Sequence, residues 1–508
     1  MGCETDKLLK AVLDEGFQIS PEALNSLSVI DNPEELIAGI IGKIKGMAEK
    51  PLVITKELIE QEVPFRERRK PVEEIRPLPV SITGRRKFKP IAKEIDPEIE
   101  VLRDPTGKLH GRGRVEDFID YFRDRYNRLY KLFLQRGDLN VVPIADLPNY
   151  KNRETVRIIA MVTSKRQTKT GKLMLEVEDL QSSIRAIVPM LNEQLAEKAA
   201  RIMLDQVLCI EGFMNGNLLV ATDIMWLNTP THHAPKKANV PICAVLISDT
   251  HIGNQTFLED AFNRFISWMR GKTGSEKQRE IAGQVKYLLI AGDIVDGIGI
   301  YPGQEKELAI KDIYEQYNVS AGFIEQIPEY VEIIIIPGNH DATRQALPQP
   351  AIPEKYSRPL HQISNVRMLG NPSQVKLHGV NFLLCHGRSL DDVAATIPRI
   401  SMNKSAEVMK ELLIGRHLAP QFGNVVQIAP EERDWLVIED IPDVFHAGHV
   451  HISGQRRYRN VTLVNSGTWQ SQTDYQRRRG IIPTPGKAHI FNLQSHQSLI
   501  MNFLETCE

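Results

Sequence analysis

Residues 332–341 read EIIIIPGNHD, four isoleucines that run directly into Pro, Gly, Asn, His and Asp. A β-branched run bounded by Pro and Gly predicts a strand that is buried on both faces, as in the layered sheets of α/β proteins. In open α/β sheets the loops at the carboxyl ends of the strands are exposed and hold ligands. We therefore expect Asn339, His340 and Asp341 at the mouth of such a strand.

The same design, an apolar run that ends in polar side chains, occurs five times after residue 241: AVLISDTH (244–251), YLLIAGDIVD (287–296), EIIIIPGNHD, FLLCHGR (382–388) and DVFHAGHVH (443–451). The donors that these runs bring to one sheet edge are Asp249, His251, Asp293, Asn339, His386, His449 and His451. Carboxylate, imidazole and amide oxygen together suit Mn, Fe, Zn or Mg. So many donors exceed the needs of one ion and match two ions that share a carboxylate.

Length and composition bound the possible classes of protein. A chain of 508 residues predicts about two to four domains. The net charge of −1 leaves nucleic-acid contacts to local basic patches, and five scattered cysteines without CxxC spacing argue against a zinc ribbon or a disulfide framework. No apolar run approaches the ~20 residues of a membrane span. The sequence therefore predicts a cytoplasmic protein that does not enter a membrane.

The chain divides into four parts by composition. Residues 1–46 carry helical periodicity and predict a small helical module, whereas residues 47–110 are rich in Pro, Lys, Arg and Glu and predict a flexible charged linker. Within residues 111–230, a helix over 115–137 precedes alternating strands with an Asn-Gly turn at 215–216, in the order of a five-stranded OB-fold barrel. The strand-and-turn motifs occupy the last part, residues 241–508.

The ordered set D-x-H, G-D-x-x-D, G-N-H-D, strand-end H-G and G-H-x-H resembles that of the calcineurin-like metallophosphoesterases over residues 241–490. With the barrel, the linker and the helical start, the chain is similar to the small subunits of the archaeal family D DNA polymerases. The resemblance implies an α/β fold: a calcineurin-like phosphoesterase sandwich of mixed β-sheets flanked by helices, preceded by the OB-fold barrel and the helical module.

The resemblance also implies roles for the donors. The site would hold two divalent ions, of which Mn²⁺ is the expected one and Mg²⁺, Fe or Zn are alternatives. Each ion would be held by its own set of donor residues, and one carboxylate would belong to both sets. The sets are Asp249, His251 and His451 for one ion, Asn339, His386 and His449 for the other, and Asp293 between them.

Five further residues receive roles next to these ligands. By the resemblance, His340 protonates the leaving O3′ and Asp341 holds the other ring nitrogen of His340. Asp296 is expected to support a ligand or to cap a turn rather than to bind an ion. Arg344 and Arg388 follow the motifs directly and are candidates for holding the substrate phosphate.

The implied activity is a metal-dependent 3′–5′ exonuclease, the proofreading small subunit of a heterodimeric replicative DNA polymerase. Its partners would be the large catalytic subunit, DNA with single-stranded or mismatched 3′ ends, and a sliding clamp. One alternative is a stand-alone metallophosphatase or phosphodiesterase, which leaves the barrel, the linker and the helical module without a role. The other is a catalytically silent scaffold subunit, which the complete donor set opposes, because unpaired acids and imidazoles at one edge are costly without metal.

Overall fold

The computed structural model describes residues 88–504, apart from 138, 151, 152 and 191. Before residue 88 it describes 12, 15, 17–20, 39–42, 44, 53–54 and 74–75. Most of the expected helical module and most of the expected linker therefore lie outside the described residues. The chain forms two compact units, Met1–Glu73 and Glu74–Glu508, and in the first of them β1 (Gln18–Ile19) pairs in parallel with β2 (Val53–Ile54). The helices of the described part include none with the length and apolar character that crossing a bilayer requires.

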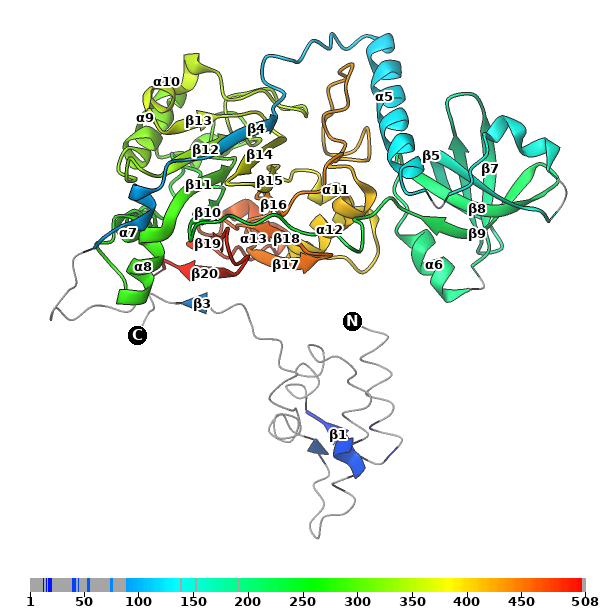
Figure 1. Ribbon diagram of the computed structural model, residues 1–508, viewed down its shortest axis with the longest axis horizontal. Coiled ribbons are helices and arrows are strands. Elements are labelled where there is room, and N and C mark those ends of the chain that lie inside the picture. Colours follow the sequence, from blue (N-terminus) through cyan, green and yellow to red (C-terminus); the bar gives the residue numbers. More distant parts are fainter. Residues whose placement is uncertain are drawn as a thin grey trace. The chain divides into compact units, whose positions relative to one another are not determined.

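The unit Glu74–Glu508 contains two mixed sheets that face each other (Figure 1). The order in the first sheet is β13 (Val366–Met368), β12 (Glu332–Ile336), β11 (Val285–Ala291), β10 (Cys243–Ile247), β19 (Lys487–Asn492), β20 (Ser498–Asn502), β3 (Glu74–Ile75). The order in the second is β17 (Gly454–Tyr458), β18 (Val461–Asn465), β16 (Val444–Ala447), β15 (Val380–Leu384), β14 (Ser373–Leu377), β4 (Ile99–Arg103). Strands β10 to β13 are parallel to one another, as are β15, β16 and β18.

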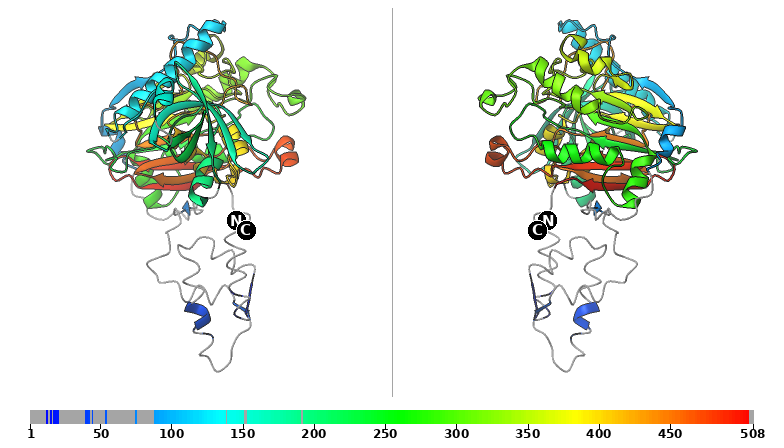
Figure 2. Two further views of the ribbon diagram at one scale, coloured as in Figure 1. Left: turned by 90° about the vertical axis from the view of Figure 1, so that its right-hand side faces the viewer. Right: turned by 90° about the vertical axis from the view of Figure 1, so that its left-hand side faces the viewer.

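Helices cover the outer faces of both sheets, so each strand that leads to a motif is buried. The first sheet packs against α7 (Glu259–Met269), α8 (Glu276–Gln284), α9 (Ile313–Ile324) and α10 (Glu354–Gln362), and the second against α11 (Leu390–Thr396) and α12 (Ser405–Gly415). Figure 2 (right) looks onto the helices of the first sheet. Strand β12 uses its isoleucines on both faces: Ile333 and Ile335 join the core under the helices, and Ile334 and Ile336 join the core between the sheets. The expected calcineurin-like sandwich of mixed sheets is confirmed.

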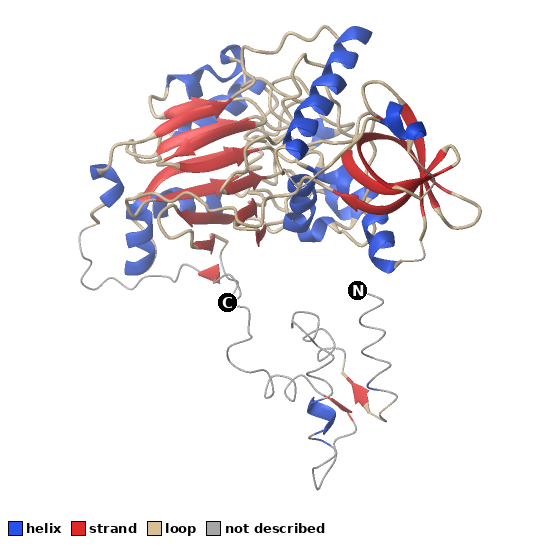
Figure 3. Ribbon diagram, turned by 45° about the vertical axis from the view of Figure 1, so that its right-hand side comes forward, coloured by secondary structure: helices blue, strands red, loops and turns tan. Residues whose placement is uncertain are grey.

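A closed barrel follows helix α5 (Val115–Leu134), and its interior has its own apolar core (Figure 3). The strands are β5 (Thr155–Gln167), β6 (Leu173–Glu178), β7 (Ser183–Val188), β8 (Val207–Asn215) and β9 (Leu218–Met225), with α6 (Glu193–Ala200) between β7 and β8. The expected turn at 215–216 joins β8 to β9. The five-stranded OB-like barrel is confirmed, whereas helix α5 ends three residues before Gly137, which has a left-handed backbone.

The last part of the expected linker, residues 88–110, is structured instead. Strand β4 adds to the edge of the second sheet beside β14, and the turn η1 (Ile91–Glu94) buries Ala92. Phe88 lies over Gly271, where a Cβ would clash with its ring. This difference has a physical reason: β4 is held by backbone pairing, and its side chains Val101 and Leu102 are exposed, so its composition carries no sign of burial.

A buried charge network fixes α5 to residues 416–439, the segment between α12 and β16. The fully buried Arg125 donates from Nε to Asp434 Oδ2 (2.8 Å), and from its other nitrogens to Pro420 O (2.7 Å) and the hydroxyl of Tyr121 (2.8 Å). His417 also donates to Asp434 (2.7 Å). Burial opposes the charge of Asp434, but His417 and Arg125 hold the pKa of Asp434 far below its usual range.

We expect Arg125→Met to lower the free energy of unfolding by about 3–5 kcal/mol, because it removes the cation that pairs with the fully buried Asp434 carboxylate and leaves it with His417 and Leu436 N as hydrogen-bond partners. The matched control is Arg123→Met on the same helix, since Arg123 forms an exposed pair with Asp120. That control should change the free energy by less than about 1 kcal/mol. Chemical denaturation of both variants measures the difference, and equal losses would contradict the role of the network.

Candidate metal centre

Five loops meet at one edge of the sandwich. The loops after β10, β11 and β12 leave the first sheet at the carboxyl ends of parallel strands, and the loops after β15 and β16 do the same in the second sheet. Because the sheets face each other, these loops converge. The structure brings together all the donors predicted from the sequence: Asp249, His251, Asp293, Asn339, His386, His449 and His451.

The first group consists of Asp249, His251 and His451. Nε2 of His451 lies 3.4 Å from Asp249 Oδ1, and Nε2 of His251 lies 3.9 Å from the same oxygen. The two Nε2 atoms lie 3.0 Å apart and face each other. Two imidazole nitrogens and a carboxylate that point into one small space form a donor set suited to a divalent cation.

The second group consists of Asp293, His386 and His449, with Asn339 beside it. Nε2 of His386 lies 3.1 Å from Asp293 Oδ2 and 3.1 Å from Asn339 Oδ1. Asp293 Oδ2 is also 3.8 Å from His251 Nε2 in the first group. One carboxylate oxygen therefore lies between the two donor groups, which is where a ligand shared by two ions has to be.

The second nitrogen of each imidazole is held by the protein, which leaves the first nitrogen facing the centre. Nδ1 of His386 donates to Ala291 O (2.8 Å), and Nδ1 of His251 lies 3.0 Å from Asp296 Oδ1. The remaining contacts are His451 Nδ1 with Gln476 Nε2 (2.7 Å) and His449 Nε2 with Asp391 Oδ2 (3.0 Å). Partners of this kind orient metal-binding imidazoles.

The backbone is left-handed at five of the donors: Asp249, His251, Asp293, His449 and His451, with φ between 49° and 71°. For residues with a Cβ this conformation costs of order 1–3 kcal/mol each, and it concentrates at functional sites. Backbone hydrogen bonds between the loops hold it: Asp249 N donates to Gly292 O (2.9 Å), and His251 N donates to Asp293 O (3.1 Å). The loops therefore support one another's geometry.

Two glycines of the motifs are required by close approach. A Cβ on Gly338 would lie 2.1 Å from Asp293 Oδ1, and one on Gly448 would lie 2.3 Å from Asp249 Oδ2. Both distances are far below van der Waals contact, so any larger residue would displace a carboxylate of the centre. The G-N-H-D and G-H-x-H patterns thus include glycine for reasons of space.

The charges of the centre are balanced within it. Burial acts against the imidazolium form of His386, but the Asp293 carboxylate raises the pKa of His386 to about 9. Burial likewise acts against ionised Asp293, and His386, among other imidazoles, keeps its pKa well below the ordinary value. The geometry therefore stabilises a carboxylate at this position and positive charge next to it, a role that a bound cation can also take.

His340 lies beside the first group, and its partner differs from the expected one. Its Nδ1 donates to the backbone carbonyl of Asp296 (2.7 Å), so the free ring nitrogen is Nε2. Asp341 was expected to hold this ring, and that expectation is wrong. The Asp341 carboxylate turns inward, accepts from Gly338 N (2.8 Å) and approaches the hydroxyl of Tyr317 (3.3 Å). Asp341 thus braces the loop after β12, while burial and nearby Asp293 raise its pKa to about 6.

The two arginines expected to hold phosphate are engaged with protein groups. Arg344 donates to Glu431 Oε1 (3.0 Å) and to Pro348 O (2.7 Å). Arg388 donates weakly to Gln345 O (3.3 Å), next to the loop of Asn339. Of the two, Arg388 has the contacts that are more easily exchanged for a substrate.

Three residues that support the centre are not predicted by the sequence patterns. Asp391 and Gln476 hold ligand imidazoles, and Gln304 donates to both Asp296 O and Asp296 Oδ2 (2.8 Å each). All three lie outside the apolar-run motifs. Only Asp391 could have been found from the sequence, because it closely follows the H-G motif.

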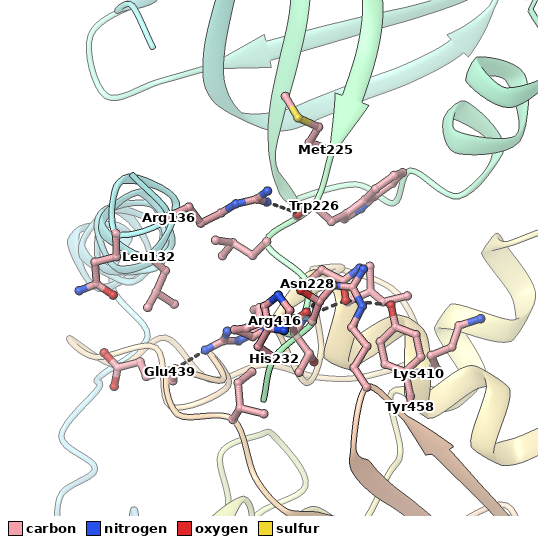
Figure 4. A pocket seen from close by; sticks show the side chains of 18 of the residues that line it. Leu132, Arg136, Met225, Trp226, Asn228, His232, Lys410, Arg416, Glu439 and Tyr458 are labelled. Atoms are coloured by element: carbon pink, nitrogen blue, oxygen red, sulfur yellow. Dashed lines mark hydrogen bonds between the residues drawn. The ribbon is translucent and has the colours of Figure 1, made fainter. Parts of the chain in front are cut away.

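A separate cavity of about 960 Å³ lies between α5, the barrel and the phosphoesterase part (Figure 4). Its wall includes Arg136, Trp226, Arg416 and Tyr458, and none of the metal-site donors. Arg136 donates to Trp226 O (3.3 Å), and Arg416 donates to Ile438 O (2.7 Å). The hydroxyl of Tyr458 donates to Asn228 Oδ1 (2.9 Å), which joins the segment after the barrel to the second sheet.

Comparisons with known proteins agree with the motifs. A model of the DNA polymerase alpha/epsilon B-subunit family matches residues 244–453, which include all the donors. The DNA polymerase II small subunit of Methanothermobacter thermautotrophicus is 42% identical over 94% of this chain and 96% of its own. That of Pyrococcus furiosus is 39% identical over 80% of this chain and 67% of its own. A solved archaeal phosphodiesterase aligns with 51% of this chain and 98% of its own at 13% identity and a TM-score of 0.27, too distant to bear on the chemistry.

Proposed function

This chain belongs to the family of DNA polymerase II small subunits, and from that premise we propose that it is the proofreading 3′–5′ exonuclease of a heterodimeric archaeal replicative DNA polymerase. Its substrate is DNA with a single-stranded or mismatched 3′ end, and its reaction is hydrolysis of the terminal phosphodiester. The observation that carries the proposal is the convergence of the seven donors, whose inner imidazole nitrogens face two carboxylates.

The donor set fits two divalent ions, with Mn²⁺ first and Mg²⁺, Fe or Zn as alternatives. Asp249, His251 and His451 would hold one, Asn339, His386 and His449 the other, and Asp293 would bridge them. When bound, such ions neutralise phosphodiester oxygens and lower the pKa of water. Because the pKa of His386 is raised to about 9, occupation of this site has to displace a proton from that imidazole.

His340 is the proton-transfer residue of the proposal. Its Nδ1–H is committed to Asp296 O, so Nε2 is the atom that exchanges a proton with the leaving O3′. Burial lowers the pKa of His340, which favours the neutral ring. The negative oxygens of a bound phosphodiester act in the opposite direction and favour the protonated ring that can act as an acid.

The strained backbone argues against a silent scaffold. Five donors with left-handed φ would persist without benefit if the chain only held its partner. A stand-alone phosphatase would use the same donors. The two functions are therefore distinguished by which substrate the chain hydrolyses. Labelled single-stranded DNA, nitrophenyl phosphate and a cyclic nucleotide, each offered to the purified chain with Mn²⁺, separate the candidates. Hydrolysis of DNA from its 3′ end supports the proposal, and exclusive hydrolysis of a small ester opposes it.

Asp293→Ala should abolish hydrolysis of DNA, because the substitution removes a ligand from both ions at once. We expect the variant to bind fewer than two ions per chain, measured by elemental analysis after desalting. Asp260→Ala, at an exposed position on α7, is the control and should keep both the ions and the activity. If the Asp293 variant kept most of its activity, the two-ion assignment would be wrong.

His340→Ala and Asn339→Ala should fail in different ways. The Asn339 variant should lose affinity for one ion and recover part of its rate at high Mn²⁺. The His340 variant should bind both ions and lose about 10²–10⁴ in rate on DNA, without recovery by metal. On a nitrophenyl phosphodiester, whose leaving group needs little protonation, the His340 deficit should shrink. Loss of an ion, or an equal deficit on both substrates, would exclude proton transfer by His340.

The partner proposed for this chain is the large catalytic subunit of the polymerase, with DNA and a sliding clamp in the same assembly in the cytoplasm. We propose that the barrel and the phosphoesterase part carry this interface. Deletion of residues 1–73 should leave the heterodimer intact, because the deletion stops before β3 and β4 and so keeps both sheets complete. Co-purification with the large subunit checks this, and loss of the complex would place the interface in the deleted part.

A further inference from the structure

Two tyrosine rings continue outward from His340. The ring of Tyr301 lies 6.2 Å from the ring of His340, edge to face at 61°. The ring of Tyr475 lies 6.4 Å from that of Tyr301, tilted by only 30°. Tyr301 is half-buried, and Tyr475 is 52% exposed. The aromatic row therefore begins at the proposed proton-transfer residue and ends at the surface.

Both tyrosines belong to segments that are hydrogen-bonded to the candidate metal centre, either to a donor or to a residue that holds a donor. Tyr301 precedes Gln304, whose Nε2 donates to Asp296 Oδ2 (2.8 Å), and Asp296 in turn holds His251. Tyr475 precedes Gln476 on α13 (Asp474–Arg479), and Gln476 contacts the ring of His451 at 2.7 Å. Each ring thus has a fixed position relative to a different ligand imidazole of the first group.

The segments that carry the two rings also expose large aliphatic side chains. Ile298 precedes Tyr301 in its loop, and Ile482 follows α13; they are 46% and 75% exposed. The hydroxyl of Tyr301 donates to Glu307 Oε2 (2.8 Å) and fixes the ring. A rim with aromatic and aliphatic faces next to a phosphodiester-cleaving centre suits the flat, poorly hydrated faces of nucleobases.

Resting on the nuclease function proposed above, we propose that Tyr301 and Tyr475 form a stacking platform for the unpaired bases next to the scissile phosphodiester. Stacking on an aromatic ring depends little on base identity, because every base has a π-face. Paired bases are already stacked within the duplex and would have to be separated first. The platform therefore selects frayed or mismatched 3′ ends over paired ones without reading their sequence.

The test uses the full chain and an oligonucleotide with 2-aminopurine at its 3′ end, whose fluorescence falls when the base stacks. With the metal removed by EDTA, the wild type should quench this fluorescence on binding, and Tyr475→Ala and Tyr301→Ala should lose most of the quenching. Tyr475→Phe and Tyr301→Phe keep the rings and should restore it. The matched control is Tyr314→Ala, because Tyr314 is also 52% exposed but packs against Tyr356 of α10 (5.8 Å).

Kinetics with Mn²⁺ provide the second readout. In each alanine variant, KM for single-stranded DNA should rise by about tenfold, with little change in kcat. KM for a nitrophenyl phosphodiester, which has no nucleobase, should stay near the wild-type value. Quenching and KM equal to those of the wild type in both alanine variants would overturn the platform. A wild type that quenches the probe but never cleaves DNA would instead contradict the nuclease function, since the EDTA experiment does not depend on catalysis.

Discussion

The candidate metal centre depends on turns that hold its donor residues in the left-handed region of the backbone. Three loops, after β10, β11 and β16, carry five such residues, and the loops after β10 and β11 are joined by backbone hydrogen bonds. The buried strands below position the loops, because Ile333 to Ile336 and their neighbours in both sheets cannot move without opening two apolar cores. Donor geometry is therefore established by folding and does not wait for a ligand.

The same logic of mutual support extends outward from the donors. Asp296, Gln476 and Asp391 each hold one imidazole, and Gln304 ties Asp296 to the loop of Tyr301. Elsewhere in the same unit, the charge network around Arg125 fixes helix α5 to residues 416–439. The barrel and the sandwich are thus connected through polar groups that are satisfied by one another, which favours one arrangement over many.

Sequence patterns predicted the strands and the convergence of the polar residues that follow them. A buried strand shows itself as an apolar run, and the carboxyl ends of parallel strands meet at one edge of a sheet. The patterns could not predict which way a turn residue points: Asp341 adjoins His340 in the chain, yet it bonds to Gly338 N inside the loop. Nor could they predict Glu431 as the partner of Arg344, or the supporting glutamines, which come from segments without a motif. Strand β4 was missed because backbone pairing leaves no trace in composition.

The edge strands β3 and β4 make the sandwich a discontinuous domain. Glu74 and Ile75 pair with Ile500 and Met501, and β4 pairs with β14, so the chain starts both sheets, leaves to build the barrel, and returns to finish them. During synthesis the barrel, whose strand pairs are local, can close while the sandwich still lacks most of its strands. Strand β20, whose edge β3 covers, comes after every other described strand in chain order. The sandwich is therefore completed after the barrel, and a chain that stops before β20 has all the strands of the barrel but an unfinished first sheet.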